Sequence, residues 1–157
     1  MLLYRIICAI LMAWGVNWSL SRDEADLMLK VLPEMATLSP VAAAFVGYFN
    51  LAVRQGWGFI VSFANGIWAG VLAILLSGVL FVVARMAQGI QTDNVQSFDN
   101  FLAVFSSTMQ PLLDEVANVP LLTVSLGASA LIGVVTEVIH WVLVRMRQRK
   151  GGGQRVN

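Results

Sequence analysis

Apolar residues in this chain fall into four long blocks rather than into short alternating runs. Each block is close to the ~20 residues that an α-helix needs to cross a bilayer. Backbone groups in hydrocarbon must be paired within a helix or a closed barrel, and no block alternates apolar and polar residues as a barrel strand does. The pattern therefore predicts an all-α, integral membrane four-helix bundle. The expected membrane helices span about 2–20, 38–53, 59–86 and 120–145.

Two polar connections between these blocks carry helical patterns of their own. Ser21 and Glu24 have the spacing of a capping box at the start of residues 22–32, and apolar residues recur at helical spacing over residues 97–117. The polar face of the second segment is acidic, whereas helices on a lipid surface are normally rich in Lys and Arg. We therefore expect two short amphipathic helices on the outer side. For the second, capping the bundle or docking to a partner is favoured over the alternative, a place in the outer lipid headgroup layer. Residues 151–157 begin with three glycines and are expected to form a flexible tail.

Composition and charge agree with a membrane protein. Hydrophobic residues make up 58% of the 157-residue chain and charged residues 12%, which is about half the charged share of a soluble domain. If both termini are cytoplasmic, seven of the ten basic residues lie inside and eight of the nine acids lie outside. This distribution follows the positive-inside rule and predicts a bacterial cytoplasmic (inner) membrane protein with both termini in the cytoplasm. The first block lacks a small-x-small cleavage site, so we expect it to be retained as a helix.

The lipid bilayer is the first expected partner, followed by other membrane proteins or a second copy of the chain. Small residues four positions apart form a stripe on each of the last two membrane helices, and such stripes let helices approach closely. Because these helices run antiparallel, packing within the chain is favoured over self-association. No basic patch with interleaved aromatic residues occurs, so nucleic acid is not expected. The stripe residues are Gly66 and Gly70 in the third helix, and Ser125, Ser129 and Gly133 in the fourth.

Four polar residues lie at similar depths in the inner half of the predicted bundle: Asn50, Asn65, Glu137 and His140. A charge at the bilayer centre costs about 2.5–3.5 kcal/mol on insertion scales, so Glu137 is expected to face the bundle interior and find a partner there. Asn65 is the expected partner, since its amide donates to a carboxyl group in either protonation state. Structural bonding between helices is the favoured role of Glu137. A proton relay, an ion site or a substrate contact is the alternative.

Catalysis, a metal and a cofactor are not expected. Glu137 and His140 have the i, i+3 spacing of a di-iron bundle, but such a site needs a second pair and two further carboxylates. His140 is the single histidine of the chain. No nucleotide-binding loop, nucleophile–base pair or cysteine cluster occurs in the sequence.

Three stretches carry a resemblance to a known family: Tyr48 to Arg54 (YFNLAVR), Ala64 to Gly70 (ANGIWAG) and Leu131 to Glu137 (LIGVVTE). In these stretches and in the order of its helices, the chain resembles the TrgA-type tellurite-resistance membrane proteins of alphaproteobacteria. The resemblance covers about the last two-thirds of the chain. It implies a role in tolerance of tellurite and supplies no catalytic residues.

The function that these observations favour is that of a non-catalytic accessory or stress-tolerance factor that works by association. Two alternatives remain. One is a small oligomeric transporter, or an ion- or proton-coupled channel, that uses Glu137. The other is an accessory subunit of a larger electron-transfer complex in the membrane, in which a lone histidine can ligate haem.

Overall fold

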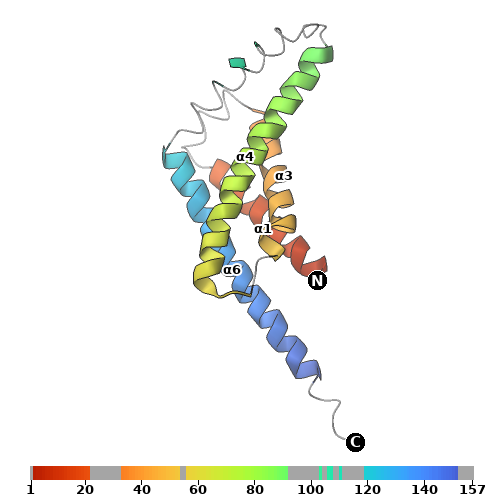
Figure 1. Ribbon diagram of the computed structural model, residues 1–157, viewed down its shortest axis with the longest axis vertical. Coiled ribbons are helices and arrows are strands. Elements are labelled where there is room, and N and C mark those ends of the chain that lie inside the picture. Colours follow the sequence, from red (N-terminus) through yellow and green to blue (C-terminus); the bar gives the residue numbers. More distant parts are fainter. Residues whose placement is uncertain are drawn as a thin grey trace, which may run out of the picture.

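The computed structural model describes residues 2–21, 33–53, 56–91, 103, 106–107, 110 and 119–151. Four long helices and one short 3₁₀ turn make up this part of the chain, and no strand occurs within it (Figure 1). In chain order they are α1 (Leu2–Leu20), α3 (Met35–Phe49), the 3₁₀ helix η2 (Leu51–Val53), α4 (Phe59–Gln91) and α6 (Val119–Gly151).

Four candidate membrane spans confirm the predicted number of long apolar helices. They are Leu2–Leu20, Met35–Val53, Phe59–Ala87 and Pro120–Gln148, and each is long and apolar enough to cross a bilayer. The second span is divided at Asn50, where α3 stops and η2 begins. The last two helices extend beyond the expected residues 86 and 145. In α6 the extension is rich in Arg, Gln and Met, which favour helix even where the apolar block has ended.

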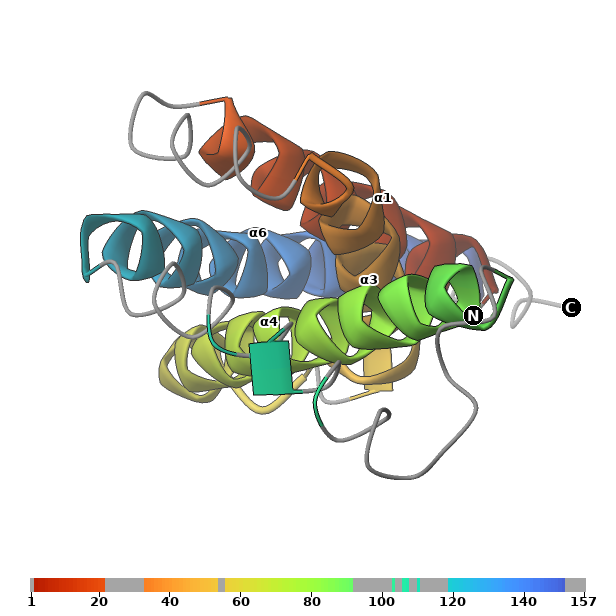
Figure 2. The same cartoon turned by 90° about the horizontal axis from the view of Figure 1, so that it is seen from above.

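The helices pack in a closed order in which α1 contacts α3, α3 contacts α4, α4 contacts α6, and α6 contacts α1 (Figure 2). Helices α1 and α3 come together closely near Gly47. A Cβ atom at Gly47 would lie 2.6 Å from the Cys8 carbonyl oxygen and 3.0 Å from the Ala9 Cα, so only glycine fits there. The core between the helices is built from Met12, Ala43, Val46, Leu51, Ala69, Ala73 and Ile132.

Large apolar side chains cover the outside of the bundle, while several polar ones lie inside it. Trp14, Phe45 and Leu131 are exposed, whereas Ser62 and Thr136 are fully buried. A soluble domain does not present so continuous an apolar surface to water. This distribution suits a bundle surrounded by lipid, in which polar side chains mediate contacts between helices.

The two ends of the bundle differ in charge. Arg5, Arg145 and Arg147 lie at the end formed by the start of α1, η2, the start of α4 and the second half of α6, which we call the basic end. At the opposite end Arg85 forms a salt bridge of 3.0 Å with Glu34, and we call this the Glu34 end.

The two predicted amphipathic helices fall largely outside the described residues. Residues 22–32 lie wholly outside them. Within residues 97–117 only 103, 106–107 and 110 are described; these are helical and exposed, and the Ser106 hydroxyl donates to the Ala103 carbonyl at 3.0 Å. The amphipathic character of both segments therefore stays a prediction.

Candidate functional site

The site is built on a close contact between α4 and α6, which run antiparallel. A Cβ atom at Gly133 would lie 2.9 Å from the Gly66 Cα, and one at Gly66 would lie 2.9 Å from the Ala130 Cα. One turn further along, a Cβ atom at Gly70 would lie 2.7 Å from the Ser129 hydroxyl oxygen. The structure thus brings four of the five stripe residues into one backbone-to-backbone contact.

This register places Ser62 opposite Glu137, because each lies one helical turn beyond the Gly66–Gly133 contact. Glu137 is only 7% exposed. The Ser62 hydroxyl donates a hydrogen bond to Glu137 Oε2 at 2.8 Å. The α4 side chain that donates to this carboxylate is therefore Ser62, whereas the sequence had suggested Asn65.

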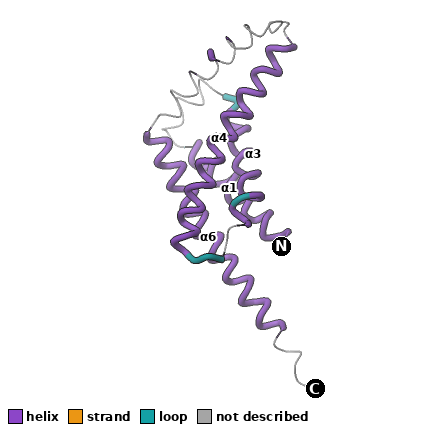
Figure 3. Tube along the Cα trace, in the orientation of Figure 1, coloured by secondary structure: helices purple, strands orange, loops and turns teal. Residues whose placement is uncertain are grey.

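Two backbone amides complete the coordination of the carboxylate. Gly56 N–H donates to Glu137 Oε2 at 2.8 Å, and Gly58 N–H donates to Oε1 at 3.2 Å. Both glycines have φ values near the left-handed region, +97° and +96°, which side-chain-bearing residues rarely adopt. The connection before α4, drawn as a short loop in Figure 3, is thereby folded onto α6 with its amides facing the carboxylate.

Position as well as hydrogen bonding favours a negative charge here. Helix α4 begins at Phe59, directly after the two donating glycines, so the Glu137 carboxylate lies at its N-terminal end. That end of a helix carries a partial positive charge. All three groups that contact the carboxylate oxygens donate to them, so the arrangement is complementary to an ionised carboxylate and joins the α3–α4 connection to α6. We refer to Gly56, Gly58, Ser62 and Glu137 as the Glu137 latch.

His140 lies beside this latch and connects it to α1. A Cβ atom at Gly56 would lie 3.2 Å from His140 Nε2, so the imidazole packs directly against the loop. The Tyr4 ring meets the His140 ring edge to face, with centroids 5.6 Å apart. The Tyr4 hydroxyl donates to the Thr136 carbonyl at 3.0 Å, which fixes the start of α1 against α6.

The other two members of the predicted polar cluster have different environments. Asn50 follows α3; its backbone N–H donates to the Val46 carbonyl at 2.8 Å, while its side-chain Oδ1 is buried without a hydrogen-bond partner. Asn65 is half-buried on α4 and precedes Gly66 by one residue, so it points about 100° away from the α4–α6 contact. The structure brings Glu137 and His140 together, and neither asparagine supplies one of the three donors.

Three contributors to the latch were missed from the sequence: Gly56, Gly58 and Ser62. Ser62 had a readable signal, since it continues the Gly66–Gly70 stripe by one turn. The Gly-x-Gly pair before α4 is also a signal, since glycines at a helix start often let backbone amides approach an anion. It is a weaker signal than the position of Ser62 in the stripe. Glu137 and His140 are the two residues of the site whose side chains are of a metal-ligating type. Among the described residues, no group of three or more His, Cys, Asp or Glu side chains is close enough to hold an ion.

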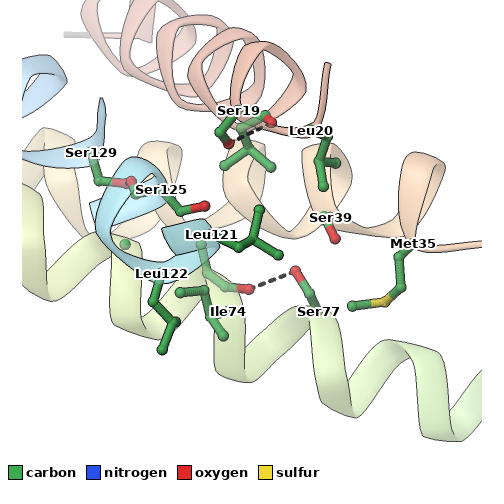
Figure 4. A pocket seen from close by; sticks show the side chains of 13 residues that line it. Ser19, Leu20, Met35, Ser39, Ile74, Ser77, Leu121, Leu122, Ser125 and Ser129 are labelled. Carbon is green, nitrogen blue, oxygen red and sulfur yellow. Dashed lines mark hydrogen bonds between the residues drawn. The ribbon is translucent and has the colours of Figure 1, made fainter. Parts of the chain in front are cut away.

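A small cavity lies on the other side of the α4–α6 contact, toward the Glu34 end. Its volume is about 60 Å³, enough for a few water molecules. Figure 4 shows serines from all four helices around it. Ser77 and Ser129 donate to carbonyls of their own helices, at 2.7 Å and 2.8 Å. The five serines of the lining are Ser19, Ser39, Ser77, Ser125 and Ser129.

The fold and the site together define a class: a small protein with four helices long and apolar enough to span a membrane, closed by glycine contacts and by a buried carboxylate latch. Comparison with protein-family models, with curated proteins and with solved structures gives no match.

Proposed function

We propose that this chain is a small multi-pass protein of the bacterial cytoplasmic membrane, with both termini in the cytoplasm. We propose further that it acts without chemistry of its own, as an accessory factor in stress tolerance. The seven-to-three distribution of basic residues supports the orientation, since it puts the basic end inside. The resemblance to TrgA-type proteins supports tellurite as the stress.

The observation that carries the non-catalytic assignment is the Glu137 latch. Glu137 is the one carboxylate within the four candidate spans. Three fixed donors engage it, and two of these are backbone amides of glycines that only a rearrangement of the α3–α4 connection would move. A group held in this way suits a structural role better than repeated binding and release of an ion.

The serine-lined cavity is the observation that favours the alternative, a small transporter. Its polar hydroxyls and its position between all four helices resemble part of a pathway. However, the Gly70–Ser129 contact and the core residues Leu51 and Ile132 lie between this cavity and the basic end. A transport path through one copy of the chain would therefore have to break the close contact between α4 and α6.

Orientation is tested with reporter fusions after Lys150 and within residues 91–98. We expect cytoplasmic activity for the first fusion and periplasmic activity for the second. A periplasmic C-terminus would reject the proposed orientation.

The role in tolerance is tested by expressing the chain in a tellurite-sensitive bacterium and measuring growth across tellurite concentrations. We expect wild type to raise tolerance, and we expect Glu137→Gln to change it only in proportion to the amount of protein in the membrane. Loss of tolerance in Glu137→Gln at wild-type abundance would favour ion or proton transfer by Glu137. No effect of wild type on tolerance would reject the stress assignment.

Accessory action is separated from transport with purified protein in liposomes. We expect tellurite flux to equal that of empty liposomes, because the bundle is closed between its two ends. Flux above that of empty liposomes would overturn the accessory role in favour of the transporter.

A further inference from the structure

A cleft of about 370 Å³ opens at the basic end of the bundle. It is bounded by the first turn of α1, by η2 and by the second half of α6. Its volume lies in the roughly 300–1,000 Å³ range of sites that bind small molecules. The cleft is separate from the serine-lined cavity and shares Tyr4 and His140 with the surroundings of the Glu137 latch.

Among the described residues, no carboxylate pairs with either of the two arginines of the lining. Arg5 lies over the Tyr48 ring, with the guanidinium carbon 5.7 Å from the ring centroid, and Arg147 is exposed. The one salt bridge among the described residues is at the Glu34 end, and no acidic residue lines the cleft. Guanidinium groups bind phosphate in a bidentate manner, so the pair is a ready site for a phosphate group.

The start of α1 adds to this preference for an anion. Three lining residues, Leu3, Tyr4 and Arg5, belong to its first turn. The first amides of a helix have no acceptor within the helix, and the helix dipole there favours negative charge. Side chains and backbone therefore act in the same direction.

Apolar residues make up much of the rest of the lining, and they distinguish between sources of phosphate. Leu3, Val53, Leu143 and Val144 form a wall beside the arginines. A free oxyanion gains nothing from such a wall, whereas the glycerol and acyl parts of a lipid bury apolar surface against it. An amphiphile with an anionic head fits both halves of the lining.

We propose that this cleft binds the phosphate group of an anionic phospholipid, with Arg5 and Arg147 as the phosphate ligands and the apolar wall against the lipid body. The assignment to the cytoplasmic leaflet rests on the orientation proposed above, whereas the binding itself does not. Positive groups at this end of the bundle also match the anionic lipid of an inner leaflet.

The test is native mass spectrometry of the purified full chain in detergent, titrated with phosphatidylglycerol or with phosphatidylcholine. Arg145→Gln is the matched control, since Arg145 lies on the same helix, stacks over the Trp141 ring at 4.8 Å and does not line the cleft. We expect Arg147→Gln to weaken phosphatidylglycerol binding about tenfold or more, as for a lost charge-assisted hydrogen bond. We expect Arg145→Gln to weaken it by less than about fivefold through the loss of general surface attraction.

Three results would overturn the proposal. Equal weakening by the two variants would show non-specific attraction to a basic surface. Equal binding of phosphatidylcholine would show an apolar groove without a phosphate site. Displacement of the lipid by millimolar inorganic phosphate would show that the site takes free oxyanions. Arg5→Lys and Arg147→Lys, which keep the charge, should retain part of the affinity and show that loss in Arg147→Gln is not loss of fold.

Failure here and failure of the proposed function are distinguishable. A wild-type protein that gives no tellurite tolerance but binds phosphatidylglycerol through Arg147 would reject the stress role and keep the lipid site. A wild-type protein that gives tellurite tolerance but binds phosphatidylglycerol and phosphatidylcholine equally would keep the stress role and reject the lipid site.

Discussion

Replacement of Glu137 is the most direct test of how the bundle is held together at its basic end. In Glu137→Leu all three donors of the latch lose their acceptor. The Ser62 hydroxyl can turn to a carbonyl one turn back along its own helix, as serines in helices commonly do. The amides of Gly56 and Gly58 have no such freedom, because they belong to the main chain and not to a rotatable side chain.

The expected cost follows from these two amides. A buried donor left without an acceptor costs about 1–3 kcal/mol. Gly58 and the neighbouring Trp57 are exposed, with Trp57 at 78%, so the loop can recover part of this cost from polar surroundings. Measured side-chain hydrogen bonds in membrane proteins average only about 0.6 kcal/mol for the same kind of reason. We therefore expect Glu137→Leu to lower the free energy of unfolding by about 2–4 kcal/mol.

Glu137→Gln should cost less, about 1–2 kcal/mol. Its amide oxygen, placed at the Oε2 position, can still accept from Gly56 and Ser62. Its amide nitrogen then faces the Gly58 N–H, donor against donor, and the charge that strengthened all three bonds is gone.

The measurement is reversible unfolding by SDS in mixed micelles, followed by circular dichroism. Glu34→Gln is the matched control, because it makes the same substitution in a carboxylate that is 32% exposed and forms a surface salt bridge; we expect it to cost less than about 1 kcal/mol. A Glu137→Leu protein within about 0.5 kcal/mol of wild type would refute the latch. A double-mutant cycle with Ser62→Ala, Glu137→Leu and the two combined gives the coupling free energy between the two side chains.

Three further substitutions are tested in the same assay. Gly133→Val should cost at least about 2 kcal/mol, because its Cβ would lie 2.9 Å from a Cα of the facing helix; Gly127→Val, where nothing lies within 4 Å, should stay within about 0.5 kcal/mol, and equal effects would contradict the close contact. Gly56→Ala should cost roughly 1–2 kcal/mol, because φ is +97° there, and an unchanged stability would mean that the loop has a different backbone. Tyr4→Phe should cost about 1 kcal/mol through loss of the hydrogen bond to the Thr136 carbonyl, and wild-type stability would mean that this bond contributes nothing.

The four membrane-length helices could be predicted because a bilayer imposes a length and a composition on each of them. The positions at which helices end beyond the apolar blocks could not be predicted from the sequence. In α6 the helix continues past the apolar block through residues such as Arg147 and Gln148, which are polar but have good helix propensity, so hydropathy gives no sign of where the helix stops. The break at Asn50 was hidden for the opposite reason, since the apolar block continues through η2 without a change of composition.

The partner of Glu137 depends on two separate quantities: the depth of a residue along its helix, and the direction in which its side chain points around the helix axis. Counting residues from the helix ends placed Asn65 at the right depth for Glu137. Direction follows from the stripe: if Gly66 faces Gly133 in an antiparallel pair, then the residue four before Gly66 faces the residue four after Gly133. That residue is Ser62, and its hydroxyl donates to Glu137 at 2.8 Å. The backbone donors of Gly56 and Gly58 had no side-chain signal at all, because every residue except proline carries the same amide.

The presence of a carboxylate inside an apolar helix has a physical reason in the short α3–α4 connection. Within three residues of the α4 start, Gly56 and Gly58 present amides that the helix cannot satisfy, since amides at a helix start have no acceptor within the helix. An apolar side chain on α6 at this position would take away their acceptor, and a neutral acceptor would meet only part of the demand. An ionised Glu137 accepts from both amides and from Ser62, and it faces the positive end of α4. The charge that appears costly from the sequence is therefore balanced by donors that the fold brings to it. An ion-carrying role for Glu137 would require the α3–α4 connection to open in every transport cycle.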